Sequence, residues 1–221
     1  MLKVKLILVL IVEGIGALIL FYFFKQQGIA DPLWNAVFHS VSAFCTAGMS
    51  LFSNGLADFT THTGINFTVA ALCYLGSIGF VVFADVWQLL RKKRKALTFT
   101  SQIILKGSFL VILSGSVLFY VLEPTIQILS IYDKVQVSLF HTVSASSTAG
   151  FNSINFGLLS IGNLFLLCLL MMIGASPSGT GGGLKITVVG IVLAHMKSSF
   201  QGLNKTVLQN IVCLLYTSPS P

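Results

Sequence analysis

The chain has 221 residues, of which 55% are hydrophobic and only 9% are charged, and its mean hydropathy is +0.91. These values exclude a soluble globular domain and indicate an integral membrane protein. The net charge of +7 does not indicate nucleic-acid binding, because the one dense basic run, RKKRK at 91–95, directly follows an apolar stretch. That position is typical of a cytoplasmic anchor, and a lipid or partner contact is the less favoured interpretation.

Four apolar stretches follow one another along the chain, at about 4–24, 64–90, 102–122 and 158–196. Each reaches the ~20 residues that a helix needs to cross a bilayer, so the sequence predicts four spanning helices. Lys3 and Lys5 precede the first stretch and place the N-terminus inside. Two crossings then return the chain to the cytoplasm at Arg91, in agreement with the basic run.

Two shorter segments that can form helices lie between these stretches, at 33–44 and 134–146. Asp31 and Pro32 predict a capped start for the first segment, and Asp133 predicts the same for the second. Both segments are too short to span a bilayer, so each must enter the membrane and turn back through the loop that follows it. We therefore expect two re-entrant pore helices.

The loops that follow these segments belong to an internal repeat, because FHSVSAFCTAGMS at 38–50 matches FHTVSASSTAGFN at 140–152 at eight of thirteen positions. Two unrelated surface turns are a much less favoured explanation. The repeated unit is a span, a short helix, a loop and a second span. It predicts an all-α membrane protein with two tandem pore units, residues 1–95 and 96–212.

Non-helical backbone at membrane depth leaves polar groups unpaired at high cost, so something polar must meet these two loops. A dehydrated cation is the simplest candidate, because carbonyl oxygens can replace its hydration shell. Small residues and a glycine suit a tight loop whose carbonyl groups all turn to one side. The predicted ion-filter residues are Cys45, Thr46, Ala47, Gly48, Ser147, Thr148, Ala149 and Gly150.

The segment IGASPSGTGGGLKIT, at 173–187, places Pro177 and five glycines inside the last apolar stretch. Proline and glycine interrupt helices, so the sequence predicts a break in the fourth span. GTGGGLK could also suggest a phosphate-binding loop, but no nucleotide-binding strand precedes it and the spacing is wrong.

These motifs resemble the Trk/Ktr/HKT superfamily of potassium transporters, and most closely the bacterial Ktr-type membrane subunit, over residues 1 to about 210. The resemblance implies that the two units are the second and third of four that surround one pore, and that residues 174–185 form a gate loop below the filter. It implies K+ as the transported ion, with no other metal, no cofactor and no enzymatic activity. It also implies a homodimer in the bacterial inner (plasma) membrane, with a cytoplasmic nucleotide-binding regulatory subunit of the RCK/KTN type. The residues that match the family's gate are Gly174, Ser176, Gly179, Thr180, Gly181, Gly182, Gly183 and Lys185.

Only two of the four expected units are present, so the chain alone is not expected to conduct. The ending CLLYTSPSP, at 213–221, breaks the helical pattern and is interpreted as a non-native tail of a truncated fragment. A natural, short, polar C-terminus is the alternative. Two other functions stay open, namely a sodium-selective relative and, less favoured, an intramembrane enzyme that uses Glu13 or the two histidines His39 and His141.

A few other residues are expected to be structural. Glu13 lies inside the first span, where a carboxylate usually faces protein or water; it is expected to bond the short helix of a neighbouring unit, and a coupling-ion or proton site is less favoured. His39 and His141 take equivalent places in the two short helices and are expected to make structural hydrogen bonds. Gly76 and Gly79 suit close helix packing.

Overall fold

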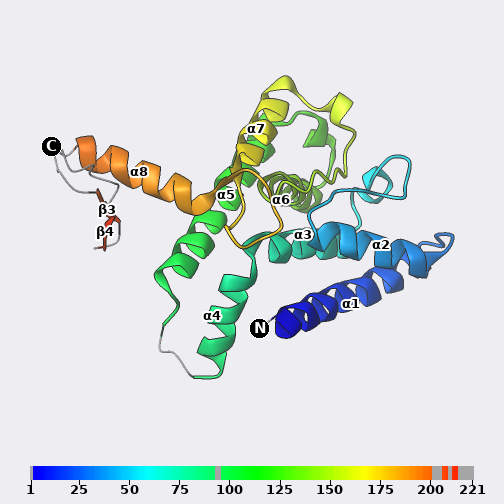
Figure 1. The fold of residues 1–221 in the computed structure, drawn as a ribbon. Coiled ribbons are helices and arrows are strands. Elements are labelled where there is room, and N and C mark those ends of the chain that lie inside the picture. Colours follow the sequence, from blue (N-terminus) through cyan, green and yellow to red (C-terminus); the bar gives the residue numbers. More distant parts are fainter. Residues whose placement is uncertain (1, 93–95, 201–205, 209–210, 214–221) are drawn as a thin grey trace.

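The computed structural model describes residues 2–92, 96–200, 206–208 and 211–213, which are mostly helical (Figure 1). The α-helices of this part are α1 (Leu2–Gln26), α2 (Pro32–Phe44), α3 (Thr63–Ile78), α4 (Phe80–Leu90), α5 (Phe99–Leu122), α6 (Ile131–Ser146), α7 (Ile161–Met172) and α8 (Ile186–Phe200). Short 3-10 helices occur at η1 (Ala57–Phe59), η2 (Thr125–Ile128) and η3 (Phe156–Leu158), and short strands at β1 (Ile173–Gly174), β2 (Leu184–Lys185), β3 (Thr206–Leu208) and β4 (Ile211–Cys213).

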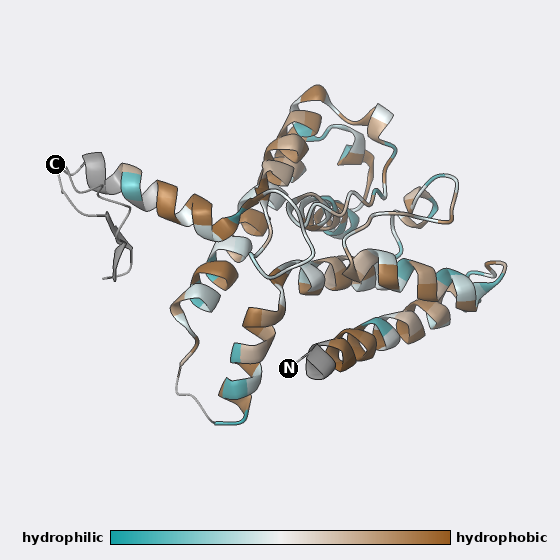
Figure 2. Ribbon diagram, viewed as in Figure 1, coloured by the Kyte–Doolittle hydropathy of each residue, from teal (hydrophilic) through white to brown (hydrophobic). Residues whose placement is uncertain are grey.

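Helices α1 and α5 are long and apolar enough to cross a membrane over Leu6–Gln26 and Phe99–Leu122. At about 1.5 Å per residue, 20 or more residues cover the ~30 Å hydrocarbon core. Their outer faces are apolar and exposed, as at Leu10 and Leu18 of α1 and Val121 of α5. Figure 2 shows the N-terminal half of α1 as one of the most hydrophobic segments, and hydrophilic residues at the end of α4 next to the basic run. These faces are suited to lipid.

The predicted span at 64–90 forms two helices, α3 and α4, which meet the length and composition of a membrane span only as one bent pair. The chain bends by 93° between α3 and α4, at Gly79, whose φ of +79° is a left-handed conformation that favours glycine. A Cβ at this position would lie 2.3 Å from the carbonyl carbon of Ser178, so a distant part of the chain occupies the corner.

The last apolar stretch is interrupted as predicted, with α7 and α8 separated by residues 173–185. Within the described residues, two helices meet the length and composition of a span, or three if α3 and α4 form one bent span. The four spanning helices predicted from hydropathy are therefore not reproduced as four continuous helices. Glycine and proline explain both interruptions, because neither favours the helix interior.

The two short helices form close to the predicted positions but begin differently. Pro32 opens α2 as predicted, whereas Asp31 has a φ of +48° and makes no capping hydrogen bond with its side chain. Helix α6 begins three residues earlier than predicted because Ser130 is the N-cap: its Oγ accepts from the backbone N–H of Asp133 at 3.2 Å and donates to Oδ2 of Asp133 at 2.7 Å. Asp133 is thus the third residue of the helix.

The same order of elements occurs twice, as α1, α2, loop, α3 and as α5, α6, loop, α7. In the first group α2 packs between α1 and α3, and in the second α6 packs between α5 and α7, while α3 contacts α6 across the two groups. One hydrophobic core joins the first group to α6, with Phe24, Val69 and Phe140 among its buried residues. A second core lies between α5, α6 and α7.

The strands are the departures from an all-α fold. Strands β1 and β2 pair in parallel, Ile173 with Leu184 and Gly174 with Lys185. This pairing holds together the two ends of the segment between α7 and α8. Strands β3 and β4 form an antiparallel pair at the end of the predicted second unit, and Cys213 of β4 is the first residue of the predicted tail. Of the predicted tail at 213–221, residues 214–221 lie outside the described residues.

Glu123 is a buried carboxylate that sequence reasoning missed. It follows the last residue of α5 and has 0% of its surface exposed. One oxygen accepts from the N–H and Oγ1 of Thr125, and the other accepts from the N–H and Oγ of Ser160 and from Nδ2 of Asn163 at 2.7 Å. Burial alone would raise the pKa of Glu123, but these hydrogen bonds outweigh it and lower the pKa. The carboxylate thereby fastens the end of α5 to the start of α7.

We expect Glu123→Gln to lower thermal stability in detergent at neutral pH, since an amide cannot accept at both ends. A charge-assisted hydrogen bond contributes about 1.5–3 kcal/mol, so the loss should be of that order. Because the folded pKa lies below the ordinary value of 4.5, the stabilisation is present above pH 4.5 and is lost as the pH falls through the folded pKa. Melting temperatures measured from pH 7 to pH 3 should therefore converge for the two proteins, and a constant gap between them would contradict this role.

Candidate functional site

Helix α2 ends in a loop at residues 45–50, here called loop A, which turns the backbone sharply. Thr46 has a φ of +52° and Gly48 a φ of +66°. The N–H of Thr46 donates to the carbonyl of Ala43 at 3.1 Å, and the N–H of Ala47 donates to the carbonyl of Ser42 at 2.8 Å. This is a Schellman motif, in which the loop's N–H groups satisfy the last carbonyls of the helix.

Helix α6 ends in the same way at residues 147–152, here called loop B. Thr148 has a φ of +59° and Gly150 a φ of +84°. The N–H groups of Thr148 and Ala149 donate to the carbonyls of Ala145 at 2.8 Å and Ser144 at 2.9 Å. A serine in each helix also supports its loop.

The supporting serines are Ser42 and Ser144, which take equivalent positions. The Ser42 Oγ donates to the carbonyl of Met49 at 2.7 Å, and the Ser144 Oγ donates to the carbonyl of Phe151 at 2.8 Å. Both loops are therefore held from one side by their own helix, through N–H groups at the start and a carbonyl at the end.

The carbonyl groups in the middle of each loop, unlike those of Met49 and Phe151, accept no hydrogen bond from their own helix. Across the described parts of the chain, no hydrogen bond is donated to the carbonyl oxygens of residues 46–48 or 148–150. The N–H groups of this part of each loop point back to its helix, so these oxygens lack a donor among the described residues, and a cation or a water molecule could serve as their partner.

Loops A and B lie against each other. A Cβ added to Gly48 would sit 1.8 Å from the carbonyl oxygen of Ala149, so only glycine allows this approach. The segments beyond the loops continue the contact, since the N–H of Leu56 donates to the carbonyl of Asn152 at 3.0 Å and the Thr60 Oγ1 donates to the carbonyl of Ser153 at 2.5 Å. The eight predicted filter residues are thus brought together at one place, with Cys45 exposed and Ala149 buried.

The glycine-rich loop, residues 174–185, lies across the ends of both helices, near the centre of Figure 1. The Thr180 Oγ1 donates to the carbonyl of Phe44, the last residue of α2, at 3.1 Å. The N–H of Gly182 donates to the Thr148 Oγ1 of loop B at 2.6 Å. The glycine-rich loop therefore connects the end of α2 with loop B.

The glycine-rich loop is also bonded to the corner between α3 and α4. The N–H of Thr180 donates to the carbonyl of Gly76 and the N–H of Ser176 donates to the carbonyl of Ser77, both at 3.1 Å. A Cβ on Gly179 would lie 2.0 Å from the Ser77 carbonyl oxygen, and one on Gly76 would lie 1.9 Å from that of Phe44. Gly76 and Gly79 were predicted to allow close helix packing. Gly76 does so against the end of α2, whereas Gly79 packs against the glycine-rich loop, a partner that the sequence did not indicate.

The remaining predicted gate residues shape the loop itself. Gly174 belongs to β1 and pairs with Lys185 of β2, and Gly183 has a φ of +73°. The Nζ of Lys185 donates to the carbonyl of Gly181 at 2.7 Å, and a Cβ on Gly181 would approach the Ser147 carbonyl oxygen to 2.7 Å. All eight predicted gate residues therefore lie in one compact loop.

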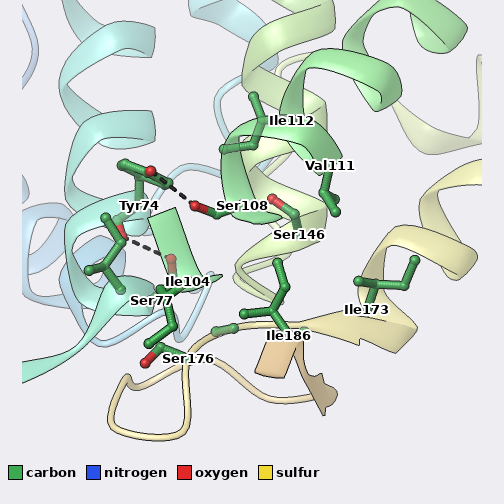
Figure 3. A pocket seen from close by; sticks show the side chains of 13 residues that line it. Tyr74, Ser77, Ile104, Ser108, Val111, Ile112, Ser146, Ile173, Ser176 and Ile186 are labelled. Carbon is green, nitrogen blue, oxygen red and sulfur yellow. Dashed lines mark hydrogen bonds between the residues drawn. The ribbon is translucent and has the colours of Figure 1, made fainter. Parts of the chain in front are cut away.

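A small cavity of about 20 Å³ lies beside the base of this loop (Figure 3). Its lining includes the hydroxyls of Tyr74 and Ser108, which are 3.1 Å apart, together with Ser146 and Ser176. Ile186, at the start of α8, closes one side. The cavity has room for about one water molecule, and its lining is mainly apolar, with these four hydroxyls as its polar groups together with that of Ser77.

Glu13 contacts the short helix of its own group, whereas the sequence favoured that of a neighbouring unit. Its carboxylate accepts from the Cys45 Sγ at 3.8 Å, and its carbonyl accepts from the Ser40 Oγ at 2.7 Å.

His39 and His141 make the structural bonds that were predicted: each Nδ1 donates to the carbonyl four residues earlier, at 2.7 and 3.0 Å. The two histidines do not share a site.

The chain matches the family model TrkH, described as cation transport protein, over residues 1–213. It is 35% identical to the Ktr system potassium uptake protein B of Vibrio alginolyticus, over 82% of this chain and 41% of that protein. It is 33% identical to the potassium/sodium uptake protein NtpJ of Enterococcus hirae, over 87% and 43%.

The fold is also similar to a solved structure, the potassium transporter TrkH from Vibrio parahaemolyticus, with a TM-score of 0.72 and 21% identity over 90% of this chain and 41% of that one. The Bacillus subtilis Ktr system potassium uptake protein B is 31% identical over 93% of this chain and 47% of its own length. The chain thus spans less than half the length of these relatives. The family match nevertheless covers nearly all of it, and the chain belongs to the TrkH family of cation transport proteins.

Proposed function

We propose that the chain forms part of the translocating subunit of a potassium uptake system, in which loops A and B supply two strands of a selectivity filter. The observation that carries this proposal is the set of carbonyl oxygens at 46–48 and 148–150, which receive no hydrogen bond from the described residues and lie in two adjacent loops. Carbonyl rings of this kind replace the hydration shell of K+. The two loops would be equivalent parts of repeated pore units, with α2 and α6 as re-entrant pore helices.

The helices that precede the loops favour a cation at the same place. Each helix end carries about half a negative charge at its C-terminus, and both α2 and α6 end at the loops. Two such ends near one cation path add to the attraction of the carbonyl oxygens without any ionised side chain. Passage of the ion down its electrochemical gradient then needs no chemical step.

The glycine-rich loop would act as the gate. Its hydrogen bonds to Phe44 at the end of α2 and to Thr148 of loop B support this role. A blocked path would open when the loop leaves the helix ends.

A complete filter needs more than these two loops, because two strands cannot surround an ion. We propose that further units of the longer protein supply the others, and that the whole works as a homodimer in the bacterial plasma membrane with a cytoplasmic nucleotide-binding regulatory subunit. The names of the Ktr relatives describe a potassium uptake system, which supports an assembly with other components.

The proposal is tested by replacing the matched segment of the V. alginolyticus protein with this chain's equivalent residues and measuring uptake of K+ in cells that lack other K+ uptake systems. We expect K+ uptake that saturates, with Na+ a poor competitor. A chimera that reaches the membrane in normal amount and takes up Na+ better than K+ would assign a sodium-selective function. One that takes up neither ion would contradict the proposal.

A further inference from the structure

We propose that the hydroxyl groups of Thr46 and Thr148 are positioning groups that tie the filter to the gate, so that the two change state together. This inference rests on the proposed function and adds a mechanism of regulation to it. It concerns the side chains of these residues, whereas the filter itself is built from their backbone carbonyls.

The tie at loop B is direct. The Thr148 Oγ1 accepts from the N–H of Gly182 at 2.6 Å, the shortest of the bonds that link the glycine-rich loop to the rest of the chain described here. A Cβ on Gly182 would lie 3.3 Å from that same oxygen and 3.8 Å from the Cβ of Thr148. The backbone at Gly182 is therefore packed directly against the Thr148 side chain.

At loop A the glycine-rich loop makes its contact through the side chain of Thr180. The Thr180 Oγ1 donates to the carbonyl of Phe44 and lies 3.3 Å from the Thr46 Oγ1, which also contacts the carbonyl of Cys45 at 2.8 Å. Thr46 is buried, so its hydroxyl has few alternatives to these partners. Each filter loop thus offers the gate one hydroxyl at the same position of its motif.

The backbone at these positions makes threonine an unexpected choice. Thr46 and Thr148 both have a positive φ, at the place in a Schellman motif where glycine is usual. A β-branched residue is a genuine outlier in that region, and the conformation costs roughly 1–2 kcal/mol for a residue with a Cβ. The turn alone does not require threonine, whereas the hydroxyl contacts to the glycine-rich loop do.

Two states of the filter follow from this tie. While the loop lies on the helix ends, the Gly182 N–H and the Thr180 side chain hold Thr148 and Thr46, and with them the carbonyls of residues 46–48 and 148–150. When the loop leaves, both threonines lose these partners. Coupling between two sites is reciprocal, so an ion that favours one filter conformation must also shift the position of the loop.

Thr148→Val tests the tie, because valine keeps the shape and the β-branch and removes only the hydroxyl. Hydrogen exchange measured on this chain in detergent should show the Gly182 amide exchanging about tenfold faster, as expected for the loss of one hydrogen bond. Thr148→Ser should restore slow exchange. Thr68→Val is the matched control, since the Thr68 hydroxyl bonds only its own helix, at the carbonyl of Gly64, and should change nothing.

The same variants in the V. alginolyticus chimera separate coupling from packing. We expect Thr148→Val to raise the rate of K+ uptake and to lower the preference for K+ over Na+, and Thr46→Val to act in the same direction more weakly, because its contact is longer. Unchanged exchange at Gly182 would overturn the tie. Faster exchange with unaltered uptake and selectivity would overturn the coupling. A wild-type chimera without any uptake would instead contradict the proposed function, and the exchange data would still report the tie.

Discussion

Deletion of residues 176–183 should raise cation uptake through the chimera by at least about tenfold. Among the described residues, the deletion removes six hydrogen bonds that hold the glycine-rich loop, to Gly76, Ser77, Val81, Phe44, Thr46 and Thr148. Each bond contributes about 0.5–1.5 kcal/mol net. Together they should favour the closed position of the loop over the open one by several powers of ten. Initial rates of K+ or Rb+ uptake, normalised to the amount of protein in the membrane, give the measurement.

A milder change at the same loop provides the internal comparison. Thr180→Val removes the hydroxyl that contacts Phe44 and Thr46 and leaves the backbone bonds of the loop in place, so it should raise uptake by a smaller factor in the same direction. The Thr68→Val chimera should keep the wild-type rate. Unchanged or reduced uptake after the deletion, with normal insertion, would show that this segment does not obstruct the ion path.

Gly48→Ala should reduce K+ uptake by roughly 100-fold. The added Cβ would fall 1.8 Å from the Ala149 carbonyl oxygen, so loops A and B would have to separate, and the φ of +66° adds its own cost. A left-handed residue costs roughly 1–2 kcal/mol and overpacking about 1–3 kcal/mol. Each 1.36 kcal/mol added to a barrier is tenfold in rate, which sets the expected loss.

Gly162→Ala is the control for this substitution. Gly162 lies in the first turn of α7, its φ is not positive, and nothing lies within 4 Å of an added Cβ, so uptake should stay at the wild-type level. The two variants should be compared for K+ and Na+ uptake and for thermal stability. Near-normal K+ uptake by Gly48→Ala would show that loops A and B do not need their present contact to conduct.

Features governed by nearby residues were predictable from the sequence. The interruption at 173–185 follows from Pro177 and its neighbouring glycines, and the short helices follow from their lengths and from Pro32. Both loops end their helices in the same way because the same residue types stand at the same positions. The start of α6 was missed since Ser130 and Asp133 are both good capping residues, and only the backbone distinguishes the N-cap from the third helical residue.

Features that depend on distant residues could not be predicted. The bend at Gly79 requires Ser178 to occupy the corner, and Thr46 meets Thr180 across 134 positions of the chain. Glu123 looks like an ordinary interfacial carboxylate until Ser160 and Asn163 are placed beside it. No periodicity within a single segment carries information on such pairs, because each is decided by how separate helices dock.

The pairing of β1 with β2 has a mechanical consequence for the glycine-rich loop. With Ile173 held to Leu184 and Gly174 to Lys185, the loop is a closed flap on a short stem, and its backbone does not have to reorganise in order to swing. Rotation about these two residue pairs would be a rigid-body hinge motion with few internal degrees of freedom, of the kind that takes microseconds to milliseconds. A pore controlled by such a flap can follow a fast regulatory signal without waiting for a segment to fold.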